Sequence, residues 1–138
     1  MHANPLKTVG TFGQSLWLDY IRRDLITSGQ LRRLIEEDGL RGMTSNPSIF
    51  EKAIVDSQEY DEDIRTMALE GKGVNAIYEA LSQRDVQSAA DEFRSLYDKT
   101  AGNDGYVSLE VNPHRRMTRK ARLRKRTDCG KRWLGPTS

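Results

Sequence analysis

The sequence predicts an α/β fold with parallel strands, and two observations support this prediction. Three short apolar segments, residues 15–21, 40–46 and 106–111, have the length and composition of buried strands. Helical segments separate them, and this alternation favours parallel pairing through right-handed crossovers. The length of 138 residues suits one ordinary domain.

The first apolar segment, SLWLDYI at residues 15–21, predicts a buried strand with Asp19 near its carboxyl end. A helix is expected to follow over residues 26–39, because apolar residues recur there at helical spacing between a capping residue and a glycine. The residues that define this helix are the N-cap Thr27 or Ser28, the apolar stripe Leu31, Leu34 and Ile35, and the terminal Gly39.

The second strand, residues 40–46, ends in polar residues, and Pro47 suits the first turn of the next helix. That helix is expected over residues 47–55, with Ile49, Phe50, Ala53 and Ile54 on its apolar side.

Residues 58–100 are expected to be helical throughout, apart from turns near residues 70–73 and 82–85. A turn at residues 102–105 then leads into the third strand. Two apolar stripes mark these helices, one of Ile77, Ala80 and Leu81 and one of Ala89, Phe93, Leu96 and Tyr97.

The net charge of +2 conceals two regions of opposite sign. Residues 115–138 contain ten Lys and Arg and one Asp, so the other residues carry twelve basic and nineteen acidic side chains. The acidic part has no electrostatic attraction to nucleic acid. The basic segment alone favours the alternative function, a nucleic-acid-binding or interaction protein whose binding weakens steeply with salt.

A cytoplasmic location is expected from several absences in the sequence. Cys129 is the only cysteine, so no disulfide can form within the chain, which suits a reducing cytosol. No apolar run approaches the length of a membrane span, and the amino terminus lacks the pattern of a secretion signal. We therefore expect no membrane partner.

Polar side chains stand at the carboxyl end of each predicted strand, where parallel α/β folds collect their chemistry. They are Asp19, the trio Thr44, Ser45 and Asn46, and Glu110. These groups could form one pocket. Position alone leaves a second interpretation open, because strand-end acids and a Thr-Ser-Asn-Pro sequence also serve as helix caps.

Three segments, SLWLDYIRRDLI, GLRGMTSNPSIFEKAI and DGYVSLEVNP, resemble the opening motifs of transaldolase. The similarity is greatest to the longer bacterial type, which also occurs as the front part of transaldolase/glucose-6-phosphate isomerase fusions, and it covers residues 4–114. Asn112 departs from the serine that the family usually has there. The resemblance implies that residues 1–114 are the N-terminal part of a (β/α)8 barrel, with about three of its eight strands.

The resemblance also implies a pentose phosphate pathway enzyme without metal or organic cofactor. Such an enzyme moves a dihydroxyacetone unit from sedoheptulose 7-phosphate or fructose 6-phosphate to an aldose phosphate through a lysine Schiff base. By this resemblance Asp19 is the general acid/base and Glu110 positions the water used in proton transfer. Asn46 hydrogen-bonds the bound unit, and Thr44 and Ser45 line the pocket.

The Schiff-base lysine of the family lies in a motif like IKIPAT on the strand after VSLEV, and no such motif occurs here. Lys120, Lys125 and Lys131 are the only lysines after Glu110, and all three lie among arginines rather than in an apolar strand. We therefore expect the chain as given to be inactive. A regulatory pseudoenzyme that binds sugar phosphate is less favoured, because the phosphate-binding arginine is also missing.

The basic segment has an explanation in the genetic code. After VNPH the family continues approximately as LAHDTEGTIAEARRLWAAVDRPN. Deleting the T of CTG from CAC CTG GCG CAT changes His-Leu-Ala-His to His-Arg-Arg-Met, as at residues 114–117. The later codons permit the same shift, and the two hidden residues that they force, an Asp and a Leu, agree with the family. We therefore expect residues 115–138 to be a frameshifted, disordered segment with no selected role.

Overall fold

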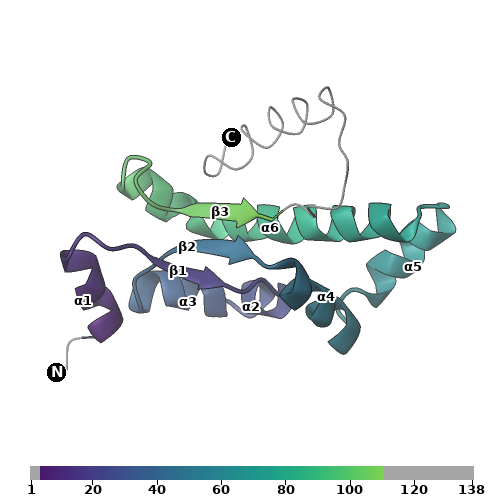
Figure 1. Cartoon of the computed structure of the whole chain (residues 1–138), viewed down its shortest axis with the longest axis horizontal. Coiled ribbons are helices and arrows are strands. Elements are labelled where there is room, and N and C mark those ends of the chain that lie inside the picture. Colours follow the sequence, from purple (N-terminus) through teal and green to yellow (C-terminus); the bar gives the residue numbers. More distant parts are fainter. Residues whose placement is uncertain (1–3, 111–138) are drawn as a thin grey trace.

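The computed structural model describes residues 4–110, and these residues build one sheet with helices packed against it (Figure 1). Strands β1 (Leu16–Asp19), β2 (Leu40–Ser45) and β3 (Tyr106–Leu109) are parallel and lie in the order β1-β2-β3. The predicted α/β class and parallel pairing are therefore confirmed. The helices are α1 (Pro5–Thr11), α2 (Arg23–Thr27), α3 (Gln30–Glu37), α4 (Pro47–Asp56), α5 (Asp61–Leu69) and α6 (Val74–Lys99).

The register of the three strands brings their carboxyl ends to one edge of the sheet. Asp19 on β1 pairs with Thr44 on β2, and Thr44 pairs in turn with Ser108 on β3. In Figure 1 all three arrows point toward α4, which follows β2 directly. The residues that end each strand are therefore neighbours in space, as the sequence predicted.

The two faces of the sheet have different surroundings. Met43 and Val107 are buried in the apolar core, and Leu18 packs against the same cluster. Because side chains alternate along a strand, the residues before and after Leu18, Met43 and Val107 in each strand lie on the other face. On that face Trp17 is 42% exposed and Ser108 is exposed. The sheet thus buries one face and leaves its other face largely open within residues 4–110.

Three helices form a single layer against the buried face. Helices α2 and α3 both contact α6, and α6 runs alongside β3 (Figure 1). The core between this layer and the sheet is built from Ile21, Leu25, Leu31, Met43, Leu81, Val86, Ala89, Phe93 and Val107. Both predicted apolar stripes of residues 77–97 contribute to this core.

The first strand is less buried than the sequence suggested. Because β1 is at the edge of the sheet, Leu16 and Leu18 are only half-buried and Trp17 and Asp19 are exposed. The strand also ends at Asp19 instead of Ile21. A continuous apolar run therefore indicated the strand correctly but overstated its burial.

The predicted helix over residues 26–39 is interrupted, and its predicted N-cap is wrong. Gly29 adopts a left-handed conformation, with φ of 78°, that ends α2 and begins α3. Because α3 starts directly after this glycine, Gly29 itself is the N-cap. Thr27 belongs to α2, where its hydroxyl donates to the carbonyl of Arg23. The predicted end of the helix is confirmed, because Gly39 has φ of 75° just after α3.

The predicted turn near residues 82–85 is wrong, whereas the turn near residues 70–73 is confirmed. Helix α6 continues without a break through Ser82 and Asp85, and both side chains are buried. Ser82 Oγ donates to the carbonyl of Glu79, and Asp85 is ion-paired. Polar residues that suggested a loop instead satisfy hydrogen bonds inside the fold.

Helix α1 was not predicted, and α2 overlaps the predicted helix only at Ile26 and Thr27; both helices are short. No helix described between residues 4 and 110 has the length and apolar character that a membrane crossing needs. Within the same range no three His, Cys, Asp or Glu side chains gather as a metal site would require. The predictions for residues 115–138 lie outside the described residues.

Candidate active site

Asp19 and Thr44 form the centre of the candidate site at the carboxyl edge of the sheet. The two residues are register partners on β1 and β2, and Thr44 Oγ1 donates a hydrogen bond of 2.6 Å to Asp19 Oδ1. The other oxygen of this exposed carboxylate lies free of hydrogen bonds to residues 4–110. The threonine therefore fixes one carboxylate oxygen and leaves the second available to accept a proton.

Asn46 directly follows β2 and caps helix α4. Its Oδ1 accepts a hydrogen bond of 3.0 Å from the backbone N–H of Ser48, and Pro47 occupies the first helical position. This is the capping interpretation that the sequence left open. It uses only the amide oxygen, and within the described residues no partner accepts from the amide nitrogen. Asn46 can therefore cap the helix and still donate a hydrogen bond to a ligand.

Ser45 and Glu110 are placed differently from the other predicted site residues. Alternation along β2 puts Ser45 on the face opposite Thr44, and this residue is only 3% exposed. Glu110 follows the last residue of β3 and is exposed. No hydrogen bond or ion pair within residues 4–110 connects Glu110 to Asp19 or Asn46. The structure thus brings Asp19 and Thr44 into contact and leaves Glu110 near the same edge without a contact to them.

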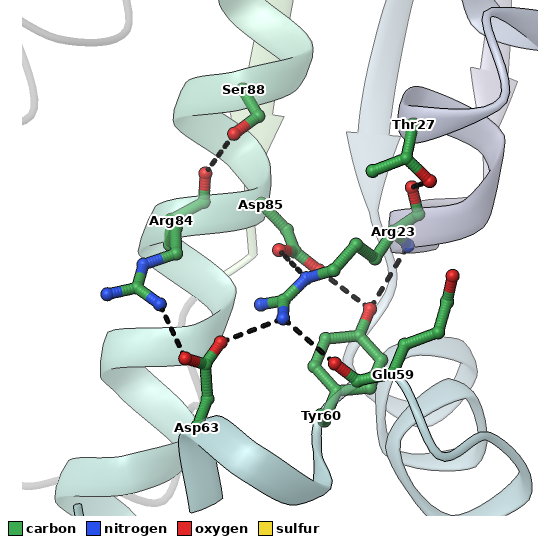
Figure 2. A network of polar contacts seen from close by, with 8 residues as sticks. All are labelled: Arg23, Thr27, Glu59, Tyr60, Asp63, Arg84, Asp85 and Ser88. Carbon is green, nitrogen blue, oxygen red and sulfur yellow. Dashed lines mark hydrogen bonds and ion pairs between the residues drawn. The ribbon is translucent and has the colours of Figure 1, made fainter. Parts of the chain in front are cut away.

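A partly buried ion-pair network is centred on Arg23, the first residue of α2 (Figure 2). Arg23 Nε donates to Asp85 Oδ1 at 3.0 Å, and Arg23 Nη1 donates to Asp63 Oδ2 at 2.8 Å. The guanidinium also lies 4.4 Å from the ring centroid of Tyr60. Helices α2, α5 and α6 are therefore held together by one arginine.

Tyr60 connects the same arginine to Asp85 through its hydroxyl. The hydroxyl donates to Asp85 Oδ2 at 2.6 Å and accepts from the backbone N–H of Arg23 at 3.1 Å. Tyr60 and Asp85 are almost completely buried, at 0% and 2% exposed. Every oxygen of the Asp85 carboxylate thus has a donor, as a buried charge requires.

The pKa values of this network follow from burial and charge. Burial raises the pKa of the Asp85 carboxyl, and the donors Tyr60 and Arg23 offset only part of that effect. Burial and the hydrogen bond to Asp85 raise the pKa of Tyr60. Burial also acts to raise the pKa of Asp63, but hydrogen bonds from Arg23 and Arg84 outweigh it and lower that pKa.

The hollow between α3 and α6 is separate from this site. It measures about 1010 Å³ and is lined by charged residues of both signs, among them Arg32, Arg41, Glu92 and Lys99. Arg41 stands near the amino end of β2, opposite to the end that carries Thr44. The strand-end groups are therefore the better candidate for chemistry.

Comparison with known proteins identifies the family. The sequence model of the family described as Transaldolase/Fructose-6-phosphate aldolase matches residues 16–126. The chain belongs to this family. The open sheet of three parallel strands is consistent with part of the barrel of this transaldolase family. The match extends past His114 into the basic segment, so the predicted boundary at that residue stays a prediction.

Individual transaldolases agree with this assignment. The chain is 48% identical to a transaldolase of Thiobacillus denitrificans over 110 residues, which are 80% of this chain and 31% of that protein. It is 45% identical to one of Trichodesmium erythraeum over 113 residues, and 44% identical to one of Saccharopolyspora erythraea over 108 residues. These matches cover 82% and 78% of this chain, and 30% and 29% of those two transaldolases. The chain therefore spans about a third of the length of these relatives.

Arg23, Tyr60 and Asp85 were not among the residues predicted for the transaldolase site. One sequence signal could have indicated Asp85, since it stands between Leu81 and Ala89 on the apolar stripe of α6. A charged residue within such a stripe must find a partner inside the fold. The identity of that partner could not be read from the sequence, because Arg23 is 62 residues away.

Proposed function

We propose that this chain provides the N-terminal part of a transaldolase, including the acid/base residue that cleaves the ketose. The observation that carries the proposal is the contact between Asp19 and Thr44 at the carboxyl ends of β1 and β2. In a chain of this family, a carboxylate at that edge with one oxygen fixed and one oxygen free suits proton transfer. Sugar phosphates are the substrates that the family implies.

The proposed step uses Asp19 as a base. The substrate ketose is bound as an iminium on a lysine supplied by the remainder of the barrel, and its third and fourth carbons are joined by the bond that breaks. Asp19 takes the proton of the hydroxyl on the fourth carbon. The electrons of the carbon–carbon bond then move into the iminium to form an enamine, and an aldehyde leaves. In the reverse direction Asp19 returns the proton to the new sugar.

Asn46 and Glu110 have supporting roles in this proposal. The amide nitrogen of Asn46 donates to a hydroxyl of the bound dihydroxyacetone unit while its oxygen keeps the cap on α4. The exposed Glu110 orients the water that carries protons during formation of the Schiff base. Thr44 lines the pocket through the hydroxyl that holds Asp19, and a pocket role for Ser45 requires access from the buried face.

The 138-residue chain by itself is proposed to be inactive, because its sequence lacks the apolar strand motif that carries the Schiff-base lysine. The test is a hybrid, called here the completed enzyme. It joins residues 1–110 of this chain to the part of the Thiobacillus denitrificans transaldolase that follows the residue aligned with Glu110. We expect the completed enzyme to convert fructose 6-phosphate with an aldose phosphate acceptor, and the 138-residue chain to do nothing. A folded but inactive hybrid would contradict the proposal.

The basic segment is proposed to be out of frame rather than functional. Its test is to sequence the DNA across the codon of His114 and to translate all frames downstream. A second frame that encodes LAHDT and then IKIPAT supports the proposal. A clean reading without that text in any frame contradicts it, and the basic segment would then require a salt titration against DNA.

A further inference from the structure

The segment that links Asp19 to helix α2 is short and is fixed at both ends. Only three residues, 20–22, separate Asp19 from Arg23. At one end Thr44 holds the carboxylate of Asp19, and at the other end Tyr60 holds the backbone N–H of Arg23. Between them Ile21 is 1% exposed in the core. A displacement of Arg23 should therefore also displace Asp19, because the three residues between them can absorb little of it.

We propose that Arg23 is a positioning residue for Asp19, acting through its ion pair with Asp85 and its contacts with Tyr60. This inference rests on the proposed function, because it assigns Arg23 to the reaction that Asp19 performs. Arg23 does not touch the substrate in this proposal. Its contacts fix the position of the first residue of α2. Through the short link, they also fix the position of Asp19 at the end of β1.

The contacts of Arg23 make this position rigid. One side chain donates to Asp85 on α6, to Asp63 on α5 and to the carbonyl of Glu59 at 3.1 Å (Figure 2). The guanidinium also stacks over the ring of Tyr60. Helices α5 and α6 and the loop before α5 thus all contact the residue that begins α2. Removing the charge of Arg23 leaves the buried carboxylate of Asp85 without its cation, so the surroundings must rearrange.

Such a rearrangement affects a proton transfer more than it affects binding. A displacement of about 1 Å at a reacting group can lower a rate by about 100-fold, because the group must meet its proton at hydrogen-bond distance. The lysine that forms the Schiff base belongs to another part of the barrel. Loss of Arg23 should therefore slow cleavage of the carbon–carbon bond and spare formation of the Schiff base.

Arg84 provides a matched control within the same network. Its Nη1 donates to Asp63 Oδ1 at 2.9 Å, so it shares a partner with Arg23. Arg84 lies on α6, and within residues 4–110 its hydrogen bonds and ion pair outside the helix backbone reach only Asp63 and Ser88, not the segment between β1 and α2 (Figure 2). Arg84→Gln removes an arginine from the network without removing the link to Asp19.

The experiment compares Arg23→Gln, Tyr60→Phe and Arg84→Gln in the completed enzyme, well below the melting temperature of each variant. We expect kcat to fall about 10- to 100-fold in Arg23→Gln, and by less in Tyr60→Phe, which keeps the ring and loses only the hydroxyl. The KM for fructose 6-phosphate should stay unchanged, and so should borohydride trapping of the Schiff base that added dihydroxyacetone forms on the lysine without any cleavage. Arg84→Gln should keep the full kcat. In an Asp19→Asn background, Arg23→Gln should add no further loss.

A second readout needs no turnover and uses the 138-residue chain as well as the completed enzyme. The carboxyl carbon of Asp19, labelled with ¹³C and assigned by its loss in Asp19→Asn, should shift in Arg23→Gln and Tyr60→Phe but not in Arg84→Gln. An unchanged resonance together with an unchanged kcat overturns the role of Arg23. If Arg23→Gln does not fold, Tyr60→Phe decides by the same criteria.

The failure of this inference differs from a failure of the proposed function. If Asp19→Asn abolishes cleavage but Arg23→Gln and Tyr60→Phe keep full kcat, only the positioning role is wrong. If Asp19→Asn keeps full kcat, the proposed role of Asp19 is wrong. An equal loss of kcat in Arg84→Gln and Arg23→Gln would also overturn the inference, because the effect would then belong to general stability.

Discussion

The indole of Trp17 lies directly over Gly42 on the open face of the sheet. The two residues are register partners on β1 and β2, and a Cβ added to Gly42 would stand 2.5 Å from Cδ2 and 2.7 Å from Cζ2 of the indole. The glycine therefore leaves room for the ring of Trp17. Trp17 is two residues before Asp19 on the same strand, so the indole packs beneath the candidate site.

Gly42→Ala is predicted to destabilise the protein by about 1–3 kcal/mol, because the new methyl group and the indole cannot occupy the same space. In a Trp17→Ala background the same change should cost much less. The free energies of unfolding of the four variants, measured by urea titration in the 138-residue chain, form a double-mutant cycle. Equal costs of Gly42→Ala in both backgrounds would show that the indole does not constrain Gly42.

Asn46 allows its structural role to be separated from its proposed role in binding. Asn46→Asp keeps an oxygen that accepts from the N–H of Ser48, so the cap on α4 and the stability should be retained. It removes the amide donor, so KM of the completed enzyme should rise. Asn46→Ala should raise KM and also lower the free energy of unfolding by about 1 kcal/mol. If Asn46→Asp matches the parent in both measurements, Asn46 is only a cap.

Thr44→Val is predicted to lower kcat of the completed enzyme roughly tenfold, because valine keeps the shape of threonine and loses the hydroxyl that holds Asp19. Thr44→Ser retains a hydroxyl and is the matched control, with kcat close to that of the parent. Steady-state kinetics with fructose 6-phosphate tests both variants. Equal kcat in Thr44→Val and Thr44→Ser would mean that the hydrogen bond does not orient the carboxylate during the reaction.

The lowered pKa of Asp63 predicts a loss of stability in acid. Its carboxylate is favoured in the folded state, so its contribution is complete above the unfolded pKa, about 3.9. That contribution disappears as the pH falls through the lower pKa of the folded state. Urea titrations at pH 6 and pH 3 should therefore show that the free energy of unfolding falls less between these two pH values in Asp63→Asn than in the parent. Asp85 acts in the opposite direction, since its raised pKa favours protonation on folding, but it is common to both proteins. Equal losses would exclude Asp63 as a source of the acid sensitivity.

The parts of the fold that could be predicted from sequence are those set by local patterns. The three strands follow from short apolar runs, and the helix at Pro47 follows from the Asn46 cap. The position of Asp19 next to Thr44 followed from a general property of parallel sheets, in which strand ends share an edge.

The parts that could not be predicted depend on contacts between distant residues. Gly29 looked like an interior residue of one helix, and only its left-handed backbone shows that it separates two helices. A turn was expected near residues 82–85, and only the ion pair with Arg23 explains how Asp85 is accommodated in the buried part of a continuous helix. The face of the sheet on which Ser45 lies likewise depends on how β2 pairs with β1 and β3, which the sequence alone does not give.

The most direct measurement of the central claim compares kcat of the completed enzyme with that of its Asp19→Asn variant. It is combined with borohydride trapping of the Schiff base that added dihydroxyacetone forms on the lysine, which needs no cleavage. We predict an active parent, a loss of about 100-fold or more in Asp19→Asn, and equal trapping in both. That result would place in this chain the group that moves the proton during cleavage. An active parent with the same kcat in Asp19→Asn would contradict the account.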